Sequence, residues 1–189
     1  MTPALTIGLA LTLVVLAWLA GTYNRFVRLR QLLRDSWADI DVELKRRHDL
    51  IPNLVEVVRG YTQYEQGVLE RVIQLRNSAS GEQDRRRLAD QETALMRGMK
   101  ELFAIVENYP DLKANRRYAA LQRELANTED RIAAARRFYN GNVRDFVVLR
   151  DSVPSTVIAS MTGFKSLDPQ YFEIADDAER VVPRVGEGG

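Results

Sequence analysis

The chain has 189 residues, with 27 Lys and Arg against 26 Asp and Glu, and its formal net charge at pH 7 is +1. So balanced a charge provides no basic field that would favour nucleic acid, and we expect no nucleic-acid partner. The absence of cysteine excludes disulfides and thiolate metal sites, although it does not identify the compartment.

The first predicted element is an apolar run from Ala4 to Thr22 that contains no charged side chain. As a helix this run spans roughly 28 Å, about the hydrocarbon thickness of a bilayer, so residues 1–24 are predicted to be a transmembrane anchor. A cleavable signal peptide is the main alternative. It is disfavoured because the first twenty residues carry no Lys or Arg, and because bulky Trp18 precedes Ala20, the small residue at the obvious cleavage position.

Aromatic and basic side chains follow the apolar run, as at a membrane interface. We expect six of them to contact the membrane: Trp18, Tyr23, Arg25, Arg28, Arg30 and Arg34. The arginines lie on the C-terminal side of the span, so the positive-inside rule predicts a single-pass protein with its N-terminus outside and its bulk in the cytoplasm. The arginines either bind anionic headgroups or only fix this topology.

Apolar residues then recur at steps of three or four, the pattern of one helix face. The stripe contains Phe26, Leu29, Leu33, Trp37, Ile40, Leu44, Ile51, Leu54, Val58, Leu69, Val72 and Leu75. Pro52 lacks an N–H and predicts a kink, or a fresh helix capped by Asp49. Because the stripe continues in phase, we expect one long kinked helix.

Residues 77–87 (NSASGEQDRRR) have no apolar period and are predicted to connect two helices. A further helix begins near Leu88 and ends at Tyr109–Pro110, and a long one runs from Tyr118 to Leu149. The segment 155–174 is predicted to form a short helix that packs on the bundle, or alternatively lies on lipid. The acidic tail, residues 176–189, is predicted to be disordered.

The predicted fold is therefore all-α, with an N-terminal transmembrane helix followed by an antiparallel bundle of three to four long helices over residues 25–175. Catalytic chemistry has little support. The single histidine, His48, stands in the cationic stretch KRRHD, and no phosphate loop, nucleophile elbow or His-Glu-x-x-His motif occurs. We expect no enzyme activity, no cofactor and no metal.

Charged residues close to the apolar stripes are candidates for an interhelical polar network. This set comprises Asp41, Arg47, Glu65, Glu129 and Arg136. Buried charges must be paired, and such pairs fix register or a subunit contact more than they add stability. The alternative, that each side chain points past the core into water, stays open.

Several stretches also resemble the signature of the LemA family. They are Tyr23–Asn24, residues 39–42 (DIDV), 45–55 (KRRHDLIPNLV), 107–115 (ENYPDLKAN), 121–125 (LQREL), 128–132 (TEDRI) and 136–140 (RRFYN). The resemblance implies a bacterial single-span protein of the inner membrane, with a helical bundle and no established enzymatic activity. Similar proteins include a magnetosome-membrane component, which implies membrane organisation. The chain has Tyr64 where the family often has histidine, so no metal role carries over there, and Asp145–Phe146 replaces the more usual Tyr-Asn.

The expected function is a non-catalytic scaffold that self-associates through coiled-coil packing of its long helices and organises or shapes the membrane. The in-phase stripe and the small residues 133–135 motivate this interpretation. An adaptor for another membrane protein, such as a quality-control protease, is the alternative. The expected partners are a second copy of the chain, the lipid membrane and, in the alternative, that membrane protein.

Overall fold

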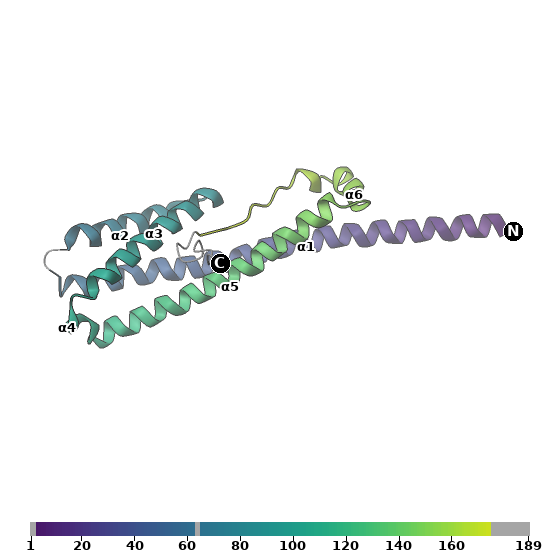
Figure 1. Ribbon diagram of the computed structural model, residues 1–189. Helices are drawn as coiled ribbons and strands as arrows, with labels where there is room; N and C mark the ends of the chain where they lie inside the picture. The colour runs from purple at the N-terminus through teal and green to yellow at the C-terminus, as the bar shows by residue number, and fades with distance from the viewer. Residues whose placement is uncertain (1–2, 63–64, 175–189) are drawn as a thin grey trace, which may run out of the picture. The chain divides into compact units, whose positions relative to one another are not determined.

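The computed structural model describes residues 3–62 and 65–174, which are helical and contain no strand (Figure 1). The elements are α1 (Pro3–Arg59), α2 (Gln66–Gly81), α3 (Arg85–Val106), α4 (Pro110–Lys113), α5 (Arg116–Asp151), α6 (Ser155–Met161) and the 3₁₀ turn η1 (Phe164–Ser166). The all-α fold with a long apolar first helix is confirmed. The predicted tail, residues 176–189, and Tyr64 lie outside the described residues.

Helix α1 continues through Pro52 instead of ending there. Proline cannot donate to the carbonyl four residues earlier, which leaves the oxygen of His48 without its helical partner. The Nε–H of Arg76, on α2, donates to that oxygen at 2.9 Å, and the same guanidinium lies 3.7 Å from Asp49. A side chain from another helix thus replaces the missing backbone donor.

The chain instead turns after Arg59, and the prediction of a single helix reaching Leu75 was wrong. The carbonyl of Val58 accepts hydrogen bonds from the backbone N–H groups of Tyr61 and Thr62, which closes the end of the helix. Val58 and Leu69 are eleven residues apart, about three helical turns, so the apolar pattern stays in phase across the break. Periodicity alone therefore gave no sign of the turn.

The connection between α2 and α3 is also shorter than the predicted 77–87, because α2 continues to Gly81. Asp84 caps α3 by accepting from the backbone N–H groups of Arg86 and Arg87, each at 3.0 Å. The two helices pack closely at Gly98, where a Cβ atom would lie 2.9 Å from a terminal methyl of Leu75. The cap at Asp84 thus starts α3 soon after α2 ends, and the absence of a side chain at Gly98 lets the two helices pack closely.

Local signals also set the start of α5. Pro110 occupies the first turn of α4, where its missing N–H costs nothing. Asn115 then caps α5, because its side-chain oxygen accepts from the backbone N–H groups of Arg117 at 2.8 Å and Tyr118 at 3.1 Å. The helix that follows extends for 36 residues.

The described chain forms two compact units, each with its own core. Unit 1 contains the chain up to Ile40 together with Ala135–Tyr171, and unit 2 contains Asp41–Ala134 and the chain from Phe172. Residues of α1 and α5 contribute to both. The core of unit 2 is largely aliphatic and includes Ile51, Leu54, Leu69, Val72, Leu95, Leu102, Val106 and Leu112. The core of unit 1 is richer in aromatic side chains and includes Phe26, Leu33, Ile40, Tyr139, Phe146, Ile158 and Phe164.

Helix α6 packs on unit 1 by one face only. Ser155, Ile158 and Ala159 are buried, as the predicted packing on the bundle requires, whereas Val157 and Met161 are exposed. The chain leaves α6 through Gly163, whose φ of +78° is the left-handed conformation that glycine adopts without steric cost. This turn brings Phe164 back into the core of unit 1.

Candidate functional site

The N-terminal part of α1 is the one helix among the described residues that is long and apolar enough to cross a membrane. Its large side chains point outward without protein partners, for example Leu11 at 63 % and Val14 at 66 % exposure. The hydroxyls of Thr6 and Thr12 donate to the carbonyls of Pro3 and Gly8 within the helix. The polar groups of this segment are therefore satisfied internally, as a hydrocarbon environment demands.

The six residues expected at the membrane lie in unit 1 and have exposed side chains. Two of them also contact the protein. The ring of Tyr23 lies 6.0 Å from the ring of Phe164, and the guanidinium of Arg30 lies 5.4 Å from the same ring. Membrane contact by all six residues stays a prediction.

Phe164 is the centre of an aromatic cluster that joins α1, α5 and η1. Its ring stacks on Phe26 at 4.9 Å and meets Phe146 edge-on at 6.4 Å, while Phe26 and Phe146 are 6.0 Å apart. Each of the three rings is at most 4 % exposed. Stacked and edge-on rings contribute roughly 0.5–1.5 kcal/mol per pair beyond burial of their area. The cluster fixes η1 against the turns of α1 that directly follow the apolar run.

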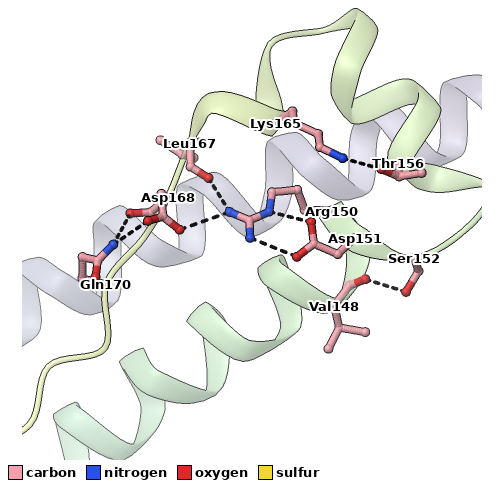
Figure 2. Close-up of polar contacts among 9 residues, drawn as sticks. All are labelled: Val148, Arg150, Asp151, Ser152, Thr156, Lys165, Leu167, Asp168 and Gln170. Atoms are coloured by element: carbon pink, nitrogen blue, oxygen red, sulfur yellow. Dashed lines mark hydrogen bonds and ion pairs between the residues drawn. The ribbon is translucent and has the colours of Figure 1, made fainter.

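Arg150, at the end of α5, fixes the segment that follows η1 (Figure 2). Its guanidinium donates to both carboxylate oxygens of Asp151 at 3.0 Å, to the carbonyl of Leu167 at 3.0 Å and to Asp168 at 3.3 Å. The hydrogen bond with Asp151 raises the pKa of Arg150, and the same bond lowers the pKa of Asp151. Arg150 thus links the segment that follows η1 to the C-terminal end of α5.

Unit 2 contains a charge cluster formed by Arg47, His48, Glu92 and Glu129. The carboxylate of Glu92 binds the guanidinium of Arg47 with one oxygen and Nε2 of His48, at 2.7 Å, with the other. A second nitrogen of Arg47 donates to Glu129 at 2.7 Å. Glu92 is fully buried, while Arg47 is 2 % and His48 is 5 % exposed. Helices α1, α3 and α5 therefore meet at Arg47, whose ion pair with Glu92 is inaccessible to water.

Two opposing effects set the ionisation of Glu92. Burial raises the pKa of a carboxyl group, but the hydrogen bond from His48 and the positive charge of Arg47 outweigh it. The pKa of Glu92 consequently falls below its ordinary value of 4.5. Both oxygens of this ionised carboxylate are used in contacts with α1, which link α1 to α3 within unit 2.

The family comparison covers this region of the chain. The family model for LemA matches residues 36–186, which is most of the sequence and includes all four residues of the charge cluster. The chain belongs to the LemA family.

Relatives of this LemA-family chain include proteins of magnetosomes. The chain is 22 % identical to magnetosome protein MamQ of Magnetospirillum gryphiswaldense, with 86 % of this chain and 70 % of that protein covered. It is 21 % identical to MamQ 2 of Paramagnetospirillum magneticum, with coverage of 90 % and 72 %. Protein LemA of Metamycoplasma hominis is 27 % identical, over 64 % of this chain and 55 % of that protein.

The structure places the five residues of the expected network differently. It brings Arg47 and Glu129 together in the charge cluster. Asp41 is exposed and Glu65 is the half-buried N-cap residue of α2. Arg136 is half-buried in unit 1, whereas the other four belong to unit 2.

Sequence reasoning missed Glu92 and His48, which complete the cluster. Glu92 lies four residues after Leu88 and three before Leu95, so it stands on the apolar stripe of α3. Its position on this stripe is the feature of the sequence that indicates a buried carboxylate. His48 was considered only as a metal ligand in a cationic stretch, and an anionic partner on another helix was not sought.

Two shallow grooves border the charge cluster in unit 2. One, of about 230 Å³, is mostly apolar and lies between α3 and α5, with Met96, Met99 and Phe103 in its wall. The other, of about 290 Å³, is polar and lies beside His48 and Asp49. Both grooves open to solvent, and among the described residues no three His, Asp or Glu side chains gather as metal ligands would. These two grooves are therefore open surfaces next to the charge cluster.

Proposed function

We propose that this LemA-family protein is a non-catalytic, membrane-anchored helical scaffold that self-associates and organises the bacterial inner membrane. One observation carries the proposal. The exposed apolar segment and the first core residues of unit 1, Phe26 and Leu29, belong to the same uninterrupted helix. A span without an intervening linker would hold the folded part directly at the bilayer surface.

Support for a structural role comes from the charge cluster. Breaking a buried ion pair is costly, whereas forming one adds little stability, so such pairs serve to specify one arrangement of helices. The sealed Glu92 carboxylate suits that purpose and does not suit proton transfer. The relatives named as magnetosome proteins further support a role at a membrane.

Anchoring in a membrane would favour self-association of the protein. Copies confined to one membrane have a high effective concentration, so weak lateral contacts between their helices add up without any tight interface. The positive charge after the span, at Arg25 and Arg28, favours the orientation with the N-terminus outside and the bulk of the chain in the cytoplasm.

Gentle extraction of the full-length protein from membranes, followed by electron microscopy and a parallel measurement of particle size, tests the scaffold. We expect large, regular particles that retain lipid. The protein should also resist extraction from the membrane at alkaline pH. A chain that stays monomeric in detergent and in lipid at high concentration, or that leaves the membrane at alkaline pH, would overturn the proposal.

Cross-linking within native membranes provides a second measurement, because the chain has no cysteine and single-cysteine variants report without background. Phe138 is 56 % exposed on α5, so a Phe138→Cys variant leaves the core intact. A bifunctional maleimide, which joins one thiol on each of two chains, should give a covalent dimer in membranes and only monomer when the protein is denatured before the reagent is added. Small uniform particles with a different protein bound would instead support the adaptor, and the bound protein would then be identified directly.

A further inference from the structure

Helix α6 and the turn before it expose an unusually apolar face. Val153, Val157 and Met161 are 85 %, 57 % and 82 % exposed, and they follow one another at intervals of four residues. The opposite face of α6 is buried through Ser155, Ile158 and Ala159. A helix that is apolar on both sides is unfavourable in water unless something covers its second face.

The position of this face within unit 1 indicates what covers it. Phe164, three residues beyond the end of α6, packs on Tyr23 and Phe26 of α1. Tyr23 directly follows the apolar run that ends at Thr22. In Figure 1, α6 follows the C-terminal end of α5, at the level where the N-terminal part of α1 extends beyond the other helices. The exposed face is therefore held beside the membrane-proximal turns of α1.

The segment is also held rigidly. Arg150 bonds to Leu167 and Asp168 on the returning chain, and Nζ of Lys165 donates to Thr156 of α6 at 3.1 Å (Figure 2). The conformation of the segment is fixed before anything binds, so binding pays little additional ordering entropy.

Charge around the face is suited to an anionic surface. Two exposed cations contact this segment, Arg30 over the ring of Phe164 and Lys165 at Thr156, whereas the acidic groups Asp151 and Asp168 are both paired with Arg150. Apolar side chains flanked by basic ones are the composition that binds an interface of anionic lipids. Three side chains are too few to bury the area that a stable protein interface needs.

We propose that Val153, Val157 and Met161 insert into the headgroup region of the bilayer beside the span, which gives the protein a second, peripheral membrane contact. This inference rests on the proposed anchoring of α1. The two contacts together would fix the rotation of α1 about its own axis, as a single helix cannot.

Depth-dependent fluorescence quenching tests the insertion in full-length protein reconstituted into vesicles of phosphatidylglycerol and phosphatidylethanolamine. Single-cysteine variants Val157→Cys and Met161→Cys carry an environment-sensitive fluorophore, and brominated lipids serve as quenchers. Phe138→Cys is the matched control, since it is exposed on α5 of the same unit and about 20 Å along the helix from Asp151. Quenching at residues 157 and 161 should be several-fold stronger than at residue 138.

A probe at Leu11→Cys, within the apolar run, separates this inference from the proposed anchoring. Strong quenching at residue 11 with none at residues 157 and 161 would overturn the insertion and leave the anchor intact. No quenching at any of these positions would overturn the anchor and the insertion together. Probes at 157 and 161 that are shielded from aqueous iodide, yet not quenched by lipid, would show that protein covers this face, which also overturns the proposal.

Discussion

The two units bury different kinds of polar group. In unit 1 the buried polar side chains are neutral, namely Ser36, Asn142 and Ser155, and aromatic rings form the centre of the core. In unit 2 the buried polar residues include the charged pair Arg47 and Glu92 together with His48. Two units built largely from the same two long helices therefore acquire their specificity in different ways, one by ring packing and the other by ion pairing.

The difference teaches that the two units should respond to different perturbations. Packing of rings depends on shape and is insensitive to pH, whereas a sealed ion pair fails when either partner loses its charge. Both tryptophans, Trp18 and Trp37, belong to unit 1, so their emission reports on that unit, while circular dichroism reports on all helices. The following experiments use this contrast.

The largest effect is expected for Glu92→Gln. The amide keeps the shape of the carboxylate but leaves buried Arg47 with the partly exposed Glu129 as its remaining anionic partner, and we expect a loss of about 3 kcal/mol in the free energy of unfolding. Urea titration in detergent, followed by circular dichroism, measures it. The control is Glu101→Gln on the same helix, whose ion pair with Arg71 is exposed and should contribute less than about 1 kcal/mol. Equal losses in the two variants would contradict the role given to the sealed pair.

The stability that Glu92 contributes should also depend on pH. Because the pKa of Glu92 is lowered in the folded protein, the unfolded chain takes up a proton first as the pH falls below about 4.5. The stabilisation from Glu92 is complete above that pH and is lost as the pH falls through the lower, folded value. Unfolding titrations between pH 7 and pH 3.5 should show a steeper loss of stability for the wild type than for Glu92→Gln. Parallel curves would exclude a contribution from this carboxylate.

An intermediate effect is expected for Arg76→Met, which removes the donor to the carbonyl of His48. An unpartnered, partly buried carbonyl should cost about 1–3 kcal/mol. In a Pro52→Ala background the restored backbone N–H at residue 52 can donate instead, so the cost of Arg76→Met should shrink markedly. A double-mutant cycle of unfolding free energies measures this coupling. Additive effects would show that Arg76 does not substitute for the missing N–H.

The smallest effect is expected in unit 1, for Phe26→Leu. The substitution keeps an apolar side chain but removes the stacking on Phe164, and it should cost about 1–2 kcal/mol. The change should appear in tryptophan emission during urea titration and should leave the pH dependence of unfolding unchanged. A new pH dependence would mean that the two cores are not chemically distinct.

Much of the fold could be predicted because its signals are local. The apolar run, Pro110 at the start of α4 and the apolar period of α3 each identify a helix or its end without reference to other segments. The turn after Arg59 was missed because the apolar residues on its two sides remain in helical phase. The continuation of α1 through Pro52 was predicted from the phase of the apolar stripe, but its compensation by Arg76 was not, because that residue is distant in the sequence.

The charge cluster was only partly predictable for the same reason. Arg47 and Glu129 stand close to apolar stripes, which suggested burial, but each charge has to be matched to a partner on another helix. Glu92 occupies a core position of α3, and a systematic search for charged residues at such positions would have found it. Which charges meet depends on how the helices pack, and a single sequence does not encode that in any local pattern.

The bond from Arg76 to the carbonyl of His48 has a consequence for the order of synthesis. The ribosome releases the chain from its N-terminus, so His48 emerges 28 residues before the side chain that completes its hydrogen bonding. Until then that carbonyl must be hydrated. The N-terminal, apolar part of α1 has no such requirement, because its hydrogen bonds are all local. The first helix of the protein is thus completed in two stages, its apolar N-terminal part early and its C-terminal end only after α2 has been made.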